Sequence, residues 1–165
     1  VSSLSKHEGG LSLDGLTELS DSAVESFSKH KGWVYLNDLT ELSDSAVENL
    51  SKHQGDLSLG GLTELSDATA EILSKFKGGD LVLEGLTELS DAGADSFSKH
   101  EGTLVLEGLT ELSESAAKSL SKHKGELYIC GLTELSDAVA NSLAKMNPQK
   151  LDLSEAAEEK VTEYR

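Results

Sequence analysis

One short stretch, Leu-Thr-Glu-Leu-Ser followed by an acidic residue, constrains the fold of this chain more than any other feature. It occurs six times, at residues 16–21, 39–44, 62–67, 86–91, 109–114 and 132–137. Successive copies are 23 or 24 residues apart. A fixed period of this length is typical of a solenoid, in which each unit buries its apolar face against its neighbours. The chain is therefore predicted to be an array of one small unit.

Each unit begins with an alternating triplet whose outer residues are aliphatic and whose middle residue varies. The triplets are residues 11–13, 34–36, 57–59, 81–83, 104–106 and 127–129. Alternation with a period of two predicts a very short strand with one buried face. Such a strand is stable only when it is paired. Its expected partner is the same strand of the next unit, so that the units build a parallel sheet.

The Leu-Thr-Glu-Leu-Ser stretch is expected to lead from the strand into the core. A glycine precedes it in every unit except the second, where Asp38 takes its place. This position, which is Gly15 in the first unit, is predicted to be a turn in the left-handed backbone region. Leu16 and Leu19 recur without exception and are predicted to be core residues.

A short helix is predicted to follow each stretch. Ser20 is the expected N-cap, and Asp21 lies in the first turn, where the helix dipole favours an acid. Lys29 is expected in the last turn, and Gly32 is expected to be the C-terminal cap. A helix of about ten residues is too short to persist alone, so packing must stabilise it.

The whole chain is predicted to be one repeat-array domain. It comprises a partial repeat at residues 1–10, six full repeats at residues 11–150, and a degenerate repeat or helical cap at residues 151–165. Two units carry one extra residue after the helix, at Gly78-Gly79 and at Asn147-Pro148. The chain begins without Met and within a repeat, so we expect it to be a segment of a longer protein.

This unit of strand, turn and helix resembles a leucine-rich repeat over nearly the whole chain. Leu11 and Leu13 match the strand leucines of the family pattern L-x-x-L-x-L-x-x-N-x-L, and Thr17-Glu18-Leu19 is similar to its N-x-L, with one extra residue before Thr17. The likeness is to short bacterial members of the family. It implies an α/β right-handed solenoid with short parallel strands on the concave face and short helices on the convex face. The Thr17 column is the candidate replacement for the family's Asn ladder.

Charge and composition exclude several classes of function. The net charge is −16, from 30 acidic and 14 basic residues, so nucleic acid and anionic membranes are not expected as partners. No apolar run reaches membrane-spanning length, and no signal peptide is visible. The lone Cys130 excludes an internal disulfide and a cysteine-based zinc site, and is expected to be solvent-accessible. No nucleophile–base pair or phosphate-binding motif is present, so we expect neither an enzyme nor a cofactor.

Two recurring columns invite a metal-binding interpretation. The first holds His7, His30, His53, His100 and His123. Phe76 and Met146 occupy the same column, so we interpret it as a packing position and predict no metal site. The second column begins with Glu18, which has no evident structural role. It is either a solvated edge copied by duplication, the favoured interpretation, or a row that collects Ca²⁺.

The variable positions of the strands form the predicted binding surface, because solenoids commonly bind partners on the concave face. Val82, Val105 and Tyr128 form an apolar stripe, and the only Trp of the chain lies with a second Tyr nearby. An apolar centre with a charged rim is how interfaces are built. The candidate residues are Trp33, Tyr35, Asp56, Asp80, Val82, Glu84, Val105, Glu107, Glu126 and Tyr128.

The leading functional hypothesis is a non-enzymatic interaction scaffold that binds a protein or peptide carrying basic groups. One alternative is a structural spacer of a larger surface protein, with cation uptake by the acidic rows. Another is part of an enzyme whose catalytic domain lies elsewhere. An uncapped repeat exposes a sheet edge, so copies of the chain could also associate end to end or through their concave faces.

Overall fold

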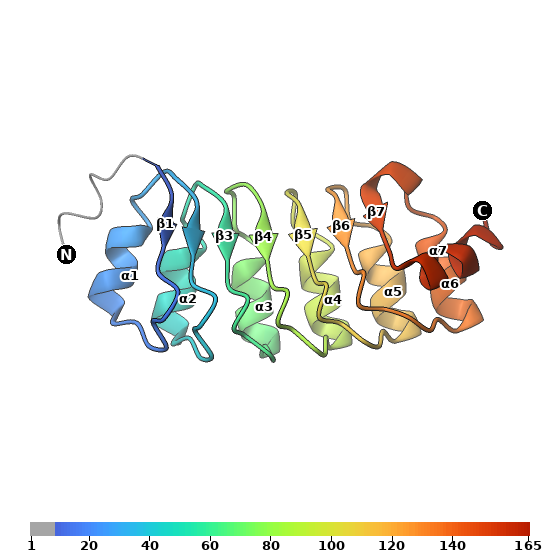
Figure 1. The fold of residues 1–165 in the computed structure, drawn as a ribbon, viewed down its shortest axis with the longest axis horizontal. Coiled ribbons are helices and arrows are strands. Elements are labelled where there is room, and N and C mark those ends of the chain that lie inside the picture. The colour runs from blue at the N-terminus through green and yellow to red at the C-terminus, as the bar shows by residue number, and fades with distance from the viewer. Residues whose placement is uncertain (1–8) are drawn as a thin grey trace.

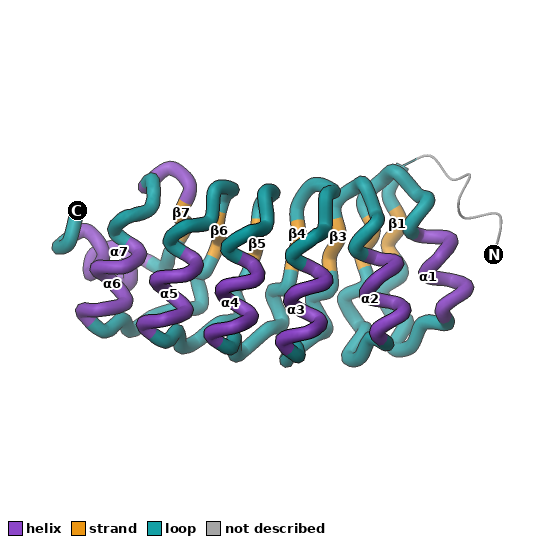
Figure 2. Tube along the Cα trace, turned by 180° about the vertical axis from the view of Figure 1, so that it is seen from behind, coloured by secondary structure: helices purple, strands orange, loops and turns teal. Residues whose placement is uncertain are grey.

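The computed structural model describes residues 9–165 as an elongated array of seven strand–helix units (Figure 1). The elements are β1 (Leu11–Ser12), α1 (Asp21–Phe27), β2 (Val34–Tyr35), α2 (Asp44–Leu50), β3 (Leu57–Ser58), α3 (Asp67–Leu73), β4 (Leu81–Val82), α4 (Asp91–Phe97), β5 (Leu104–Val105), α5 (Glu114–Leu120), β6 (Leu127–Tyr128), α6 (Asp137–Leu143), the 3-10 helix η2 (Pro148–Lys150), β7 (Leu151–Asp152) and α7 (Glu155–Thr162). The strands form one layer and the helices another, as the view from behind shows (Figure 2). Most of the predicted partial repeat at residues 1–10, with His7, lies outside the described residues.

The sheet is open and parallel, and its strand order β1 to β7 follows the chain. Equivalent residues of successive units are paired, and the pairing survives the extra residue at Gly78-Gly79, since Leu57 still pairs with Leu81. Each of β1 to β6 is one residue shorter than its predicted triplet, but the third residue still joins the ladder. The amide of Leu83, for example, donates to the carbonyl of Val105 at 2.9 Å. The predicted α/β repeat solenoid is thus confirmed.

The core lies between the two layers and is filled by columns of equivalent residues. The fully buried leucines of the Leu16 column are Leu39, Leu62, Leu86, Leu109 and Leu132. Leu16 itself is 39% exposed, so its prediction as a core residue was wrong. It lies in the first described unit, at one end of the array, where burial between neighbours is incomplete. The Leu19 column is only partly buried and packs against the edge of the core.

Close approach of the backbones of successive units explains the glycine before the last four Leu-Thr-Glu-Leu-Ser stretches, whereas Gly15 has open space around it and a positive φ. Only Gly9 and Gly15 have a positive φ among residues 9–165, so the predicted left-handed turn was wrong for the rest of this column. A Cβ added at Gly108 would lie 2.3 Å from the carbonyl oxygen of Glu84, in the preceding unit. Backbone crowding therefore requires glycine there. In the second unit the carboxylate of Asp38 accepts a hydrogen bond from the amide of Gly15.

At three places in the array the Ser–acid pair that ends the stretch joins neighbouring helices. Ser113 is the N-cap of α5 and accepts a hydrogen bond from the amide of Ala116. Its hydroxyl also donates to Asp91, the first residue of α4. The same inter-unit bond joins Ser43 to Asp21 at 3.1 Å. A serine cap of this kind contributes about 1 kcal/mol to stability. The acid interacts both with the dipole of its own helix and with the serine of the next unit.

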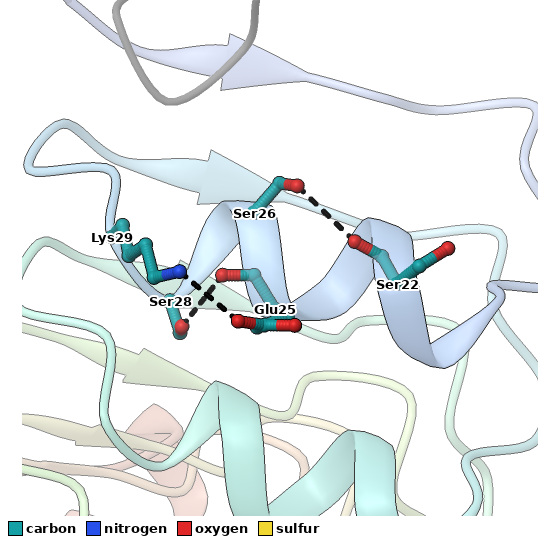
Figure 3. Close-up of polar contacts among 5 residues, drawn as sticks. All are labelled: Ser22, Glu25, Ser26, Ser28 and Lys29. Carbon is teal, nitrogen blue, oxygen red and sulfur yellow. Dashed lines mark hydrogen bonds and ion pairs between the residues drawn. The ribbon is translucent and has the colours of Figure 1, made fainter. Parts of the chain in front are cut away.

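The repeat helices span seven residues, so the predicted length of about ten was too long. In α1 the hydroxyl of Ser28, just after the helix, donates to the carbonyl of Glu25 at 2.8 Å (Figure 3). Lys29 lies beyond this cap, outside the predicted last turn, and its ammonium is 3.0 Å from the Glu25 carboxylate. Both side chains are exposed, so this ion pair contributes only about 0.3–0.5 kcal/mol.

Gly32 does not cap the helix as predicted. Its φ is not positive, and a Cβ added there would lie 1.8 Å from the carbonyl oxygen of Gly9 and 2.8 Å from Nε2 of His30. The column is therefore glycine because a neighbouring backbone and an aromatic ring leave no room for a side chain.

The C-terminal residues close the last unit, as predicted for a helical tail. Helix α7 buries Ala157 and Val161 and contacts α6. The ammonium of Lys160 lies 2.7 Å from the carboxylate of Asp137 at the start of α6. Upstream, Asn147 caps η2 by accepting a hydrogen bond from the amide of Gln149, which accommodates the second extra residue.

Two glycine-to-alanine substitutions should change stability in opposite directions. Gly108→Ala forces a methyl group against backbone carbonyls and should reduce the free energy of unfolding by about 1–3 kcal/mol. Gly93 lies in α4, where an added Cβ would lie 2.9 Å from the flexible end of Leu89, 3.1 Å from the Ser90 hydroxyl and in ordinary contact with Ala70. Gly93→Ala should therefore raise the free energy of unfolding by about 0.5–1 kcal/mol. Urea denaturation of both variants provides the measurement, and equal stability of Gly108→Ala and the parent chain would contradict the crowding argument.

Candidate functional site

The outward side of the sheet, which we call the sheet face, carries the variable residues of the strands. In β4 and the residue after it, Leu81 and Leu83 are fully buried, whereas Val82 between them is partly exposed. Side chains alternate in this way because successive residues of a strand point to opposite sides. The leucines therefore pack toward the helices, and the middle residues face away from them.

Val82, Val105 and Tyr128 form one continuous apolar stripe. Val82 pairs with Val105, and Val105 pairs with Tyr128, so the three side chains occupy the same position on β4, β5 and β6. All three are partly exposed. Since neighbouring strands lie about 4.8 Å apart, the stripe is about 10 Å long. The structure thus brings together the three predicted apolar anchors.

Carboxylates border this stripe on both sides. Asp80 and Glu126 precede their strands, Glu84 and Glu107 follow theirs, and all four are exposed. The hydroxyl of Tyr128 donates to the Glu126 carboxylate at 3.0 Å. This hydrogen bond, followed by the charge of Glu126, raises the pKa of Tyr128 above its usual value. The stripe therefore lies in a negative electrostatic field.

One contributor to this field was missed in the sequence. Asp152 pairs with Tyr128 across β6 and β7, is exposed, and helps to raise the pKa of the Tyr128 phenol. Asp152 occupies the same position in β7 that Val82, Val105 and Tyr128 occupy in their strands. That position in the sequence was the signal that could have identified it as part of this surface. Lys150, two residues before Asp152, directs its ammonium to the carbonyl of Lys124.

Asp56 was predicted to be a charged rim residue, but its carboxylate has a structural partner. It is partly buried and accepts a hydrogen bond from the amide of Asp80 at 3.0 Å. A Cβ on Gly79 would lie only 1.9 Å from the same carboxylate. Asp56 thus stabilises the loop that contains the extra residue.

Trp33 and Tyr35 form a separate aromatic patch on β2 and the residue before it. Their ring centroids are 4.5 Å apart, and the two residues are 39% and 37% exposed. The indole lies over Gly10, where an added Cβ would be 1.6 Å from the ring. Large exposed aromatic side chains are frequent anchors of interfaces.

A polar pair separates the aromatic patch from the apolar stripe. Ser58 lies between Tyr35 and Val82 in the sheet and is buried. Its hydroxyl donates to the side-chain oxygen of Asn37 at 2.6 Å, and that oxygen also accepts from the amide of Gly60. The sheet face therefore offers two apolar areas with a structural polar contact between them.

Cys130 lies on the same face but is poorly suited to nucleophilic chemistry. It is only partly exposed, less open than predicted. Burial is the main cause that raises the pKa of its thiol, and the charges of Asp152 and Glu107 raise it further. A raised pKa lowers the fraction of thiolate, which is the reactive form.

The histidine column is a buried stack of rings, which confirms the predicted packing position. His30, His53, Phe76, His100 and His123 are all buried. Successive rings lie 6.1–6.4 Å apart at interplanar angles of 9–19°. The imidazoles are therefore interchangeable in shape with the phenyl ring of Phe76.

The glutamates equivalent to Glu18 form an exposed row along one edge of the array. Within residues 9–165, no three carboxylate, imidazole or thiol side chains converge as a metal site requires. The neighbouring Thr17 column is exposed as well. One inter-unit bond of the proposed threonine ladder forms, from the Thr87 hydroxyl to the Thr63 carbonyl at 3.2 Å.

No protein-family model matches the sequence of this chain, and no curated protein is significantly similar to it. None of the helices between residues 9 and 165 combines the length and the apolar character that crossing a bilayer requires.

Removal of the Glu126 charge should lower the pKa of Tyr128 toward its usual value. Glu126→Gln eliminates the charged hydrogen-bond acceptor that favours the protonated phenol. Alkaline titration of phenolate absorbance measures this shift, and Tyr128→Phe identifies the signal. Glu84→Gln is the matched control that neutralises a rim charge not bonded to Tyr128. An unchanged titration in Glu126→Gln would show that Glu126 does not control this phenol.

Proposed function

We propose that this chain is a non-enzymatic interaction scaffold, built as a leucine-rich-repeat-like array, whose sheet face binds a protein or peptide segment carrying both basic and apolar side chains. The observation that carries the proposal is the stripe of Val82, Val105 and Tyr128 bordered by carboxylates. These residues lie in register on three neighbouring strands and remain partly exposed.

The apolar stripe has no evident role in the fold. The core is filled from the opposite side of the strands by leucines that are fully buried. Ser12 and Ser58 occupy the same column as the stripe, so the sheet accepts polar residues there. Burial of valine and tyrosine surface against a partner would release water and stabilise a complex.

Charge favours a basic partner. The stripe is bordered by Asp80, Glu84, Glu107 and Glu126. The hydrogen bond to Glu126 and the charge of Glu126 raise the pKa of Tyr128, and burial and the charges of Asp152 and Asp80 raise it further, as expected for a group near several negative charges. Lysine or arginine side chains that flank apolar ones would complement both features of this surface.

The dimensions of the surface favour a short segment over a large rigid partner. From β2 to β6 the sheet spans about 19 Å, enough for the aromatic patch of Trp33 and Tyr35 and the apolar stripe to contact one partner. An interface of this size lies at the low end of specific complexes, so we expect binding that is weak and sensitive to salt.

Replacement of the stripe by serine should weaken binding by at least about tenfold, since the lost apolar contacts are worth more than about 1.4 kcal/mol. The probe is a peptide selected from a random display library against the immobilised chain, with affinity measured by calorimetry. The variant is Val82→Ser, Val105→Ser, Tyr128→Ser. Serine already occupies this column at Ser12 and Ser58, so the fold should tolerate it.

Two matched variants separate the contributions of the surface. Glu84→Gln with Glu107→Gln should weaken binding and reduce its dependence on salt. Glu18→Gln with Glu41→Gln removes the same charge from the exposed edge and should change affinity little. A selected peptide that binds the triple serine variant as tightly as the parent chain would refute the proposed site.

A further inference from the structure

Two buried imidazoles, those of His100 and His123, lie in the connections that lead to two strands of the apolar stripe. His100 connects α4 to β5, and His123 connects α5 to β6. The residues are only 1% and 6% exposed, and their rings stack 6.1 Å apart with an interplanar angle of 9°. Each ring packs within the connection that leads to a strand of the stripe.

The ring nitrogens of this histidine pair form no hydrogen bond of good geometry. Nε2 of His100 faces Gly102, where an added Cβ would lie 3.0 Å away, and Nε2 of His123 faces Gly125 at 2.8 Å. Backbone carbonyls lie nearby, those of Ser74 and Thr103 for His100 and those of Glu126, Gly102 and Phe97 for His123. At neutral pH the rings therefore pack as apolar groups.

The charges around the pair oppose protonation. Lys77 acts on His100 and Lys150 acts on His123, and both are cations. A proton on either imidazole would also repel a proton on the other, since the rings are stacked. Phe76, on the other side of His100, offers no charge at all. Burial is the largest cause that lowers the pKa of both histidines, and these cations lower it further, while the nearby backbone carbonyls oppose the shift only in part.

We propose that His100 and His123 form an acid-sensitive device: below neutral pH their protonation opens the connections that lead to β5 and β6 and loosens the sheet face at the stripe. A buried imidazolium without an anion is expensive, so the ring must reach water for the proton to bind. Only movement of residues 100–103 and 123–126 away from the core can expose it.

The direction of the pH dependence follows from the lowered pKa values. In the unfolded chain a histidine titrates near 6.5, whereas in the folded array each of the two titrates at lower pH. The unfolded state therefore binds more protons below about pH 6.5. Stability is complete above that value and decreases as the pH falls toward the folded pKa values. Most carboxylates remain ionised in this range, because their usual pKa values are near 4.

This device would regulate the binding surface. A partner held on the sheet face would be released in mild acid, because β5 and β6 carry Val105 and Tyr128. That consequence rests on the proposed function, whereas the loosening itself does not.

Phenylalanine substitution of the pair tests the device without a partner. Phe76 shows that this column accepts a phenyl ring, so His100→Phe, His123→Phe should fold and remain packed. Urea midpoints are measured between pH 7.5 and 5.5 for this variant and for the parent chain. Each difference of one between folded and unfolded pKa changes the folding equilibrium about tenfold, so the parent midpoint should fall clearly more than that of the variant.

A reciprocal variant, Phe76→His, extends the stack of imidazoles and should steepen the pH dependence. Hydrogen exchange of the parent chain locates the change: protection of the amides of Leu104, Leu106 and Ile129, which bond across β5, β6 and β7, should fall in acid. Protection in the double phenylalanine variant should change less over the same range.

Identical pH dependence in the parent chain and the double phenylalanine variant would overturn the proposal. If that variant failed to fold, NMR titration of the parent imidazole protons would decide instead. Titration of His100 and His123 near 6.5 with no loss of amide protection would also overturn it. A pH difference that persists without any peptide binding would leave this inference standing and remove only the proposed function.

Discussion

The close approach of each unit to the backbone of the one before it is the constraint on which the rest of the structure depends. A Cβ at Gly108 or Gly131 would lie 2.1–2.3 Å from a carbonyl oxygen of the neighbouring unit. This spacing permits the parallel ladder, in which each strand of two residues is stable only because of its neighbours. It also places the N-cap serine of one helix within reach of the acid that starts the previous helix, as in Ser113 and Asp91. The same contact therefore organises the sheet, the helix starts and the core.

The middle residues of the strands, whose side chains point away from the core, vary from unit to unit and lie on the sheet face. The Leu-Thr-Glu-Leu-Ser stretch recurs because most of its residues contact a neighbouring unit. The first leucine packs in the core, the serine caps the helix, and the acid that follows accepts a hydrogen bond from the serine of the next unit. Val82, Val105 and Tyr128 have no comparable role, and their partial exposure is not required by the fold. The repeated motif thus builds the frame, while chemical variety is concentrated on the strands beside it.

Comparison of equivalent positions in successive units predicts this fold well. A position that holds leucine or serine in every unit has the same environment each time, so the repetition identifies that environment. The parallel strands, their register, the N-cap serines of α2 to α6 and the packing role of the histidines could all be inferred in this way. The hydroxyl of Ser20, the predicted N-cap of α1, makes no capping hydrogen bond. The role of the glycines could not be inferred in this way. Gly32 and Gly108 are glycine because backbones distant in sequence approach them closely, whereas the neighbouring residues in the sequence predict turns and helix caps. Single departures were also invisible. Leu16 is exposed because it lies at one end of the array. The carboxylate of Asp56 accepts a hydrogen bond from the amide of Asp80, in the loop that contains the extra residue after α3. The apolar stripe was predictable because it depends only on register.

Nearest-neighbour packing also determines how far a local change can spread. In an array where each helix contacts the next along the chain, disturbance of one unit acts mainly on the two units beside it. Protonation of His100 and His123, in the connections that precede β5 and β6, would therefore act on β4 to β7, the strands that carry the apolar stripe and Asp152. In a globular protein with one central core, two uncompensated buried charges would act on the whole domain. Here the linear architecture confines the effect to the part of the surface where an apolar stripe and several carboxylates meet.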